Sequence, residues 1–62
     1  MTTKVYYVIA TEDVLNAFKT IKNTIPCFIQ IVLEDNDTIY HCSIQCREED
    51  VAYVERVLAP YV

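Results

Sequence analysis

The residues best suited to chemistry lie in one short segment: residues 27–46 hold all three cysteines and the only histidine of the 62-residue chain. Cysteine thiolates and imidazole nitrogens are the usual ligands of zinc, and two nearby thiols can form a disulfide. A zinc site needs four convergent ligands, whereas Cys42 and Cys46 would lie roughly 13 Å apart along a strand at about 3.3 Å per residue. We therefore expect no metal site and no cofactor.

The same segment predicts a β-hairpin, because residues 27–34 and 38–46 alternate with a period of two around Asp35-Asn36-Asp37. A two-residue loop at Asn36-Asp37 sets apolar side chains opposite one another on one face, in the pairs Leu33–Tyr40, Ile31–Cys42, Ile29–Ile44 and Cys27–Cys46. A three-residue loop mixes the faces, because it opposes Leu33 to Ile39, Ile31 to His41 and Ile29 to Ser43. We favour the even loop, which places the three cysteines on the core face and His41 on the opposite face.

In that register Cys27 and Cys46 are directly opposed, with Cβ atoms about 4.5–5.5 Å apart. A disulfide needs roughly 3.5–4.5 Å between them, so a bridge would require local adjustment of the strands. We expect instead that the cysteines are buried free thiols that act as small apolar side chains.

A strand and a helix are expected before the hairpin. Residues 4–10 are rich in β-branched and aromatic side chains and contain no breaker, which predicts a strand. Residues 11–23 predict a helix that Thr11 caps and that carries Glu12 and Asp13 in its first turn. Its apolar stripe comprises Val14, Phe18 and Ile21.

A second helix is expected after the hairpin, opened by Glu48, Glu49 and Asp50 and ended by Pro60. Its apolar stripe comprises Val51, Val54 and Leu58. The chain contains no glycine, so left-handed turn positions should fall to Asn36 and Asn23. The same absence excludes phosphate-binding and dinucleotide-binding loops, which need glycine where the backbone approaches phosphate.

The order β-α-β-β-α predicts one α+β domain over residues 1–62, with a three-stranded antiparallel sheet in the order 1-3-2 and both helices on one face. This order resembles the ferredoxin-like fold without its last strand, and in particular the ACT-type regulatory domains. The similarity covers the first strand, the helix at 11–23, the hairpin and the final helix, which opens with Arg47-Glu48-Glu49-Asp50-Val51. ACT domains bind amino acids near the first strand-to-helix turn. The resemblance therefore implies a ligand site between subunits at Thr11, Glu12 and Asp13.

Charge and composition exclude several classes of protein. The net charge is −4, and the five basic residues are scattered, which argues against binding of nucleic acid or an anionic membrane. No apolar run approaches the roughly 20 residues that cross a bilayer. The N-terminus does not have the pattern of a signal peptide, so we expect a cytoplasmic protein with reduced thiols. No nucleophile, base and orienting group occur in a recognisable motif, so we expect no catalysis.

The sheet face that carries His41 is the predicted binding surface. It should present Phe28, Val32 and Ile39 together with His41, and either Tyr6 and Val8 or Val5, Tyr7 and Ile9 from the first strand. This is more apolar surface than a monomer usually exposes, and the first strand is also an open edge. We therefore expect a small acidic homodimer that binds or regulates another protein. The alternatives are an ACT-like sensor of small molecules and an acidic inhibitor of a basic nucleic-acid-binding protein.

Overall fold

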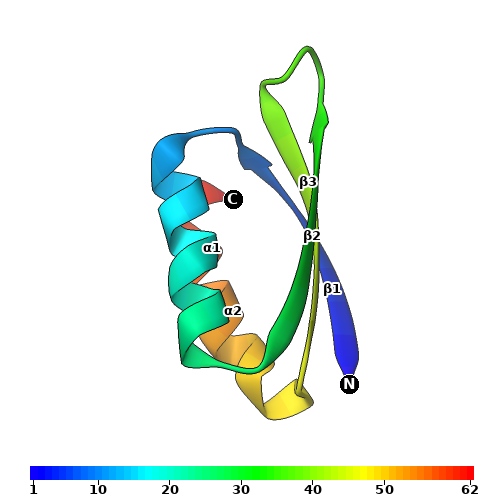
Figure 1. Cartoon of the computed structure of the whole chain (residues 1–62), viewed down its shortest axis with the longest axis vertical. Helices are drawn as coiled ribbons and strands as arrows, with labels where there is room; N and C mark the ends of the chain where they lie inside the picture. Colours follow the sequence, from blue (N-terminus) through cyan, green and yellow to red (C-terminus); the bar gives the residue numbers. More distant parts are fainter.

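Three strands form one antiparallel sheet, in which β3 (Ile39–Cys46) lies between β1 (Thr2–Ile9) and β2 (Cys27–Glu34). In the computed structural model, which describes all residues from 1 to 62, the helices α1 (Glu12–Thr24) and α2 (Val51–Leu58) cover the same face of this sheet (Figure 1). The predicted α+β fold and the strand order 1-3-2 are confirmed. Two short 3-10 turns, Glu48–Asp50 and Ala59–Tyr61, flank α2.

The first helix begins where the sequence predicts, because the Thr11 hydroxyl oxygen accepts a hydrogen bond from the Val14 amide at 3.2 Å. The helix ends without a left-handed residue. Ile25 follows it in an extended conformation (φ −130°, ψ 153°), which the next residue, Pro26, favours for steric reasons. The prediction of a left-handed conformation at Asn23 is therefore wrong.

The hairpin has the predicted register. Leu33 lies opposite Tyr40, Ile31 opposite Cys42, and Cys27 opposite Cys46. The even number of residues in the loop is thus confirmed, and the segregation of apolar from mixed pairs was a sufficient guide to it.

The hairpin loop is wider than the two residues expected, because the strands end at Glu34 and resume at Ile39. Three successive residues, Asp35, Asn36 and Asp37, have positive φ angles of 53°, 56° and 65°. The left-handed region costs an ordinary residue about 1–2 kcal/mol, and Asn and Asp tolerate it best after glycine. The glycine-free chain therefore makes this turn with Asp and Asn, the residue types that tolerate the left-handed conformation best after glycine.

The core lies between the sheet and the helices and draws on every major element except β2. The central strand β3 contributes Cys42, Ile44 and Cys46, which are all at most 1% exposed. The other buried residues are Val8 from β1, Val14, Ala17, Phe18 and Ile21 from α1, and Val54 and Leu58 from α2. Val51 of the predicted stripe is only half-buried. The acidic triplet that was expected to open the second helix forms a 3-10 turn, and α2 begins at Val51.

Candidate functional site

The sheet face turned away from the helices, called here the outer face, is the first candidate surface. Pairing with β3 assigns Val5, Tyr7 and Ile9 to this face, which decides between the two sets left open by the sequence. The remaining outer-face residues are Thr3 from β1, Phe28, Gln30, Val32 and Glu34 from β2, and Ile39, His41, Ser43 and Gln45 from β3. The apolar side chains are well exposed: 68% for Phe28, 62% for Ile9 and 55% for Val32.

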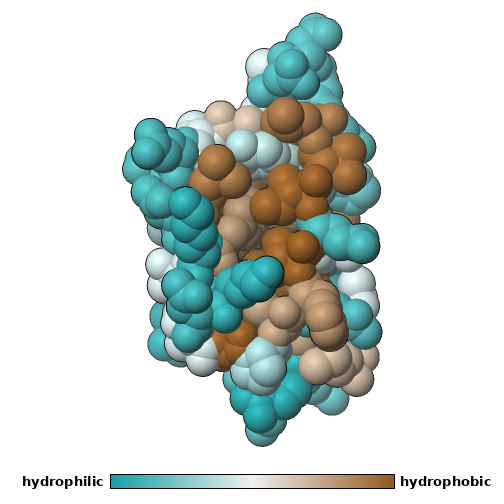
Figure 2. Space-filling view, in the orientation of Figure 1, coloured by the Kyte–Doolittle hydropathy of each residue, from teal (hydrophilic) through white to brown (hydrophobic).

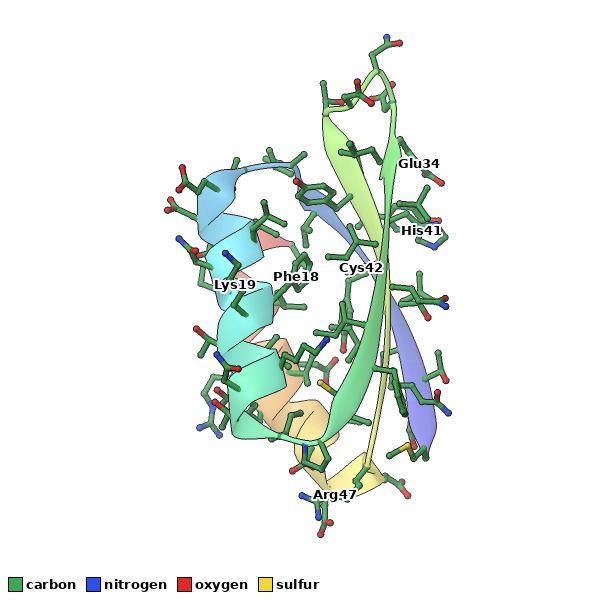
Figure 3. The ribbon with its side chains drawn as sticks, viewed as in Figure 1. Phe18, Lys19, Glu34, His41, Cys42 and Arg47 are labelled. Atoms are coloured by element: carbon green, nitrogen blue, oxygen red, sulfur yellow. The ribbon has the colours of Figure 1, made fainter.

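His41 lies at the centre of the apolar half of the outer face. Its ring stacks on that of Tyr7, with centroids 4.7 Å apart and planes 8° from parallel. Its Nδ1 atom lies 3.3 Å from a carboxylate oxygen of Glu34, and Val32 is its direct neighbour on β2. Figure 3 shows His41 and Glu34 on the opposite side of the sheet from Phe18 and Cys42. The predicted orientation of His41 is confirmed, and its stacking on Tyr7 fixes the position of both rings.

The outer face has two different halves: the half around His41 is apolar, and the half around Phe28 is polar. Thr3, Gln30, Ser43 and Gln45 surround Phe28 at a shallow hollow of about 380 Å³. Phe28 is four residues from Val32, which corresponds to roughly 13 Å along a strand. The predicted partner-binding residues therefore form two parts: a continuous group of Val32, Ile39 and His41, and an isolated Phe28 among amide and hydroxyl groups.

The free edge of β2 is a second candidate surface, which the sequence reasoning missed. Ile31 and Leu33 point toward the helix side, as predicted, but they remain 37% and 49% exposed instead of entering the core. Figure 2 shows apolar side chains along this edge, which faces the viewer, beside the polar side chains of α1. A groove of about 250 Å³ runs between α1 and β2, lined by Leu15, Phe18, Lys19, Lys22, Ile29 and Ile31.

The exposure of Leu33 follows from the lengths of the elements. The 13 residues of α1 span about 20 Å, whereas the eight residues of β2 span about 26 Å before the loop begins. α1 runs back from the start of β2, so it cannot cover the far end of the strand. Comparison of the two predicted lengths is the signal that would have revealed this edge.

The three cysteines are free, and they do not converge on a metal site. Cys42 and Cys46 are buried and Cys27 is half-buried. The Cys42 thiol donates a hydrogen bond to the Tyr6 carbonyl oxygen at 3.3 Å. Burial raises the pKa of all three thiols above the ordinary value, so they are protonated at neutral pH. No group of three or more His, Cys, Asp or Glu side chains is arranged to hold a metal ion.

Tyr6 carries a buried polar atom that the fold leaves unpaired. Its hydroxyl oxygen has no hydrogen-bond partner in the protein, and burial raises the pKa of this phenol. An unpaired buried hydroxyl costs about 1–3 kcal/mol.

We therefore expect Tyr6→Phe to stabilise the fold by about 1 kcal/mol, because it removes the hydroxyl and keeps the ring. Urea unfolding followed by circular dichroism would measure the change. Tyr7→Phe is the matched control, since that ring is exposed and its hydroxyl loses little on folding. A Tyr6→Phe variant that is less stable than the original protein would contradict this account.

The turn between β1 and α1 holds Thr11, Glu12 and Asp13, the residues implied by the resemblance to ACT domains. The Thr11 hydroxyl is occupied by the helix cap, and both carboxylates are exposed in the first helical turn. Thr11 and Asp13 border an open, mostly apolar groove of about 510 Å³ that also touches the C-terminal residues Pro60, Tyr61 and Val62. All three positions are thus explained by formation of the helix.

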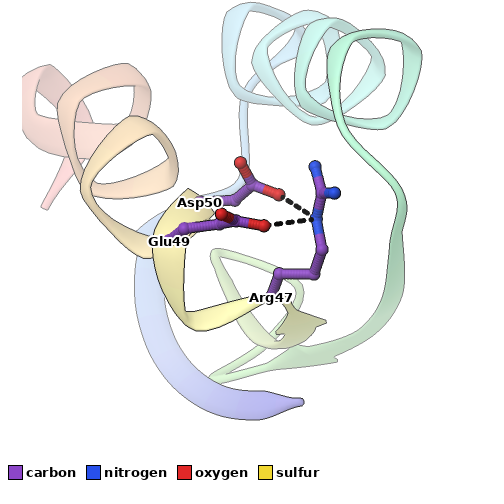
Figure 4. A network of polar contacts seen from close by, with 3 residues as sticks. All are labelled: Arg47, Glu49 and Asp50. Atoms are coloured by element: carbon purple, nitrogen blue, oxygen red, sulfur yellow. Dashed lines mark hydrogen bonds and ion pairs between the residues drawn. The ribbon is translucent and has the colours of Figure 1, made fainter.

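The acidic triplet after β3 also has a local role. The Arg47 Nε atom lies 2.9 Å from a carboxylate oxygen of Asp50 and 3.4 Å from one of Glu49 (Figure 4). These contacts close the 3-10 turn that leads into α2, together with a hydrogen bond from the Asp50 amide to the Arg47 carbonyl oxygen at 2.9 Å. The cluster therefore directs the chain from β3 into α2.

The protein has no significant match among known family models, curated proteins or solved structures. The resemblance to ACT domains therefore rests on the order of elements alone. Neither helix has the length and the apolar composition that crossing a bilayer requires.

Proposed function

We propose that this protein is a non-enzymatic interaction module that forms a homodimer through its outer face and binds another protein. One observation carries the proposal: exposed Val5, Tyr7, Ile9 and Val32 surround His41 on a sheet face with no helix over it. The whole face of three strands and eight residues covers roughly 14 by 26 Å, and its apolar half presents these side chains to water as one group.

The small number of charged side chains on the outer face supports a second copy as its occupant. The chain carries a net charge of −4, which opposes self-association. The outer face, however, has Glu34 as its only carboxylate. Two such faces can stack about 10 Å apart, as sheets do in sandwiches, without bringing the acidic helices together.

Self-association also compensates for the small size of the domain. A chain of 62 residues buries only about 60% of the surface that it exposes when unfolded, so its own core supplies limited stability. The three free thiols support a reducing, cytoplasmic location for the dimer. The scattered basic residues support a protein partner over nucleic acid or a membrane surface.

Sedimentation equilibrium is the test of the dimer. Stacked outer faces bury less than a standard interface, so we expect a weak dimer that predominates at about 200 μM protein. Val32→Glu should give a monomer with an unchanged circular dichroism spectrum, because Val32 is exposed and its replacement leaves no cavity. Ala52→Glu, which adds the same charge on the exposed side of α2, should remain dimeric. A monomeric original protein, or equal dissociation of both variants, would contradict the proposal.

A further inference from the structure

The free edge of β2 exposes backbone groups that are ready to pair with another strand. On the β1 side, the Ala10 amide donates a hydrogen bond to the Thr38 carbonyl oxygen at 2.9 Å. Because hydrogen-bonded pairs alternate along an antiparallel ladder, the even-numbered residues of β3 direct their amide and carbonyl groups toward β1. The odd-numbered residues of β3 direct theirs toward β2. Antiparallel pairing then occupies the even-numbered residues of β2. The amide and carbonyl groups of Cys27, Ile29, Ile31 and Leu33 face outward from the sheet.

This edge lacks the features that usually protect an edge strand. Natural edges are blunted by lysine, proline, bulges or a covering element. Residues 27–33 contain no charged residue and no proline, and every residue of β2 pairs with β3 without a bulge. The other edge, β1, carries Lys4 within the strand. β2 is therefore the edge that is open to strand addition.

The groove beside β2 has a charge opposite to that of the whole protein. Lys19 and Lys22, two of only five basic residues in a chain of net charge −4, line it together with Ile29 and Ile31. Figure 3 shows Lys19 on α1, away from the outer-face pair of Glu34 and His41. The site thus combines apolar side chains toward the end of β2 with two ammonium groups toward its start.

We propose that this edge binds an extended peptide segment of the partner protein, which adds to the sheet antiparallel to β2. The inference names the partner class of the interaction module and so rests on the proposed function. Directly opposed residues in such a pair share a face, so the peptide residues opposite Leu33 and Ile31 are apolar. The residue opposite Ile29 is acidic and meets Lys19 and Lys22. Because the peptide runs antiparallel to β2, its sequence from the N-terminus is an apolar residue, any residue, a second apolar residue, any residue and an acidic residue.

A second copy of the chain fits this edge less well. Antiparallel pairing of β2 with its copy places both α1 helices on the same side of the joined sheet. Each pair of lysines then faces its own symmetry mate across the seam, and like charges in such positions repel. A carboxylate of an acidic peptide would instead be attracted to the ammonium groups of Lys19 and Lys22.

The test uses a fluorescent peptide of about eight residues, with valine at the two apolar positions, glutamate at the acidic one and threonine between them. Lys19→Glu combined with Lys22→Glu should weaken its binding, measured by anisotropy, about tenfold. A peptide with lysine in place of the glutamate should bind this variant better than it binds the original protein. Lys4→Glu combined with Arg56→Glu makes the same charge change elsewhere and should leave affinity unchanged.

Backbone pairing is tested separately from charge. Methylation of the peptide amides that face β2 should abolish binding, since those amides can no longer donate. In amide NMR spectra the peptide should shift Ile29, Ile31 and Leu33 and slow their hydrogen exchange. Equal binding of the methylated peptide, or shifts confined to the outer face, would overturn the inference.

Sedimentation of the same samples separates this inference from the homodimer. Peptide binding by a protein that sediments as a monomer would support the edge site and contradict only the outer-face dimer. A dimer that binds no peptide would contradict only the edge site. Dissociation of the dimer by a peptide that shifts Ile29, Ile31 and Leu33 would place the second copy on β2 and contradict only the outer-face dimer, whereas dissociation with shifts confined to the outer face would contradict the edge site.

Discussion

Replacement of Ile44 by alanine is expected to leave the protein largely unfolded at 25 °C. Ile44 is fully buried on β3, where it opposes Ile29 and belongs to the core between the sheet and the helices. Truncation of a buried isoleucine to alanine costs about 2–5 kcal/mol, through lost burial and the cavity left behind. A domain of this size has only about 3–5 kcal/mol of stability in total.

Circular dichroism and urea unfolding at about 5 μM, below the range of weak dimerisation, would measure this effect. Val5→Ala is the control, because Val5 is 52% exposed on the outer face and should cost less than about 1 kcal/mol. If Ile44→Ala lost no more stability than Val5→Ala, β3 would not be the centre of the core.

The second large effect is a loss of stability at alkaline pH. The pKa values of the Cys42 and Cys46 thiols are raised by burial above the ordinary value of 9.0. Below that value both folded and unfolded chains hold these protons, and stability is unaffected. Above it the unfolded chain releases them while the folded chain keeps them, so stability is lost at up to about 1.4 kcal/mol per group and pH unit until the folded thiols ionise too.

Thermal unfolding between about pH 8 and about pH 10 should therefore show a steep fall in melting temperature. Cys42→Ala should lower stability throughout and make this fall shallower, because one buried thiol is gone. Val57→Ala, at a half-buried position on α2, should lower stability without changing the slope. A melting temperature that stays constant over this range would show that the thiols are accessible to solvent in the folded protein.

The sequence predicted the hairpin in detail because its faces differ in composition. Four pairs of apolar residues meet in only one register, and the structure has that register. The cap at Thr11 and the end of α2 before Pro60 were equally predictable, since each depends on one residue and its immediate neighbours.

The failures concern properties that depend on other elements. Asn23 was expected to be left-handed from its residue type, but Pro26 takes the chain into β2 through an extended Ile25. Leu33 has the pattern of a core residue, yet its burial depends on how far α1 extends over it. The stacking of His41 on Tyr7 depends on pairing between β1 and β3, strands separated by 29 residues in the chain.

The outer face and the β2 edge point in perpendicular directions, since one is normal to the sheet and the other lies in its plane. A dimer stacked through its outer faces therefore keeps both β2 edges free. It would be bivalent, with two equivalent peptide sites related by the dimer axis. A partner that carries two copies of the segment, or is itself dimeric, would then be held far more tightly than one segment alone, because the second contact forms at high effective concentration. In that arrangement, weak dimerisation makes tight capture depend on the concentration of the protein.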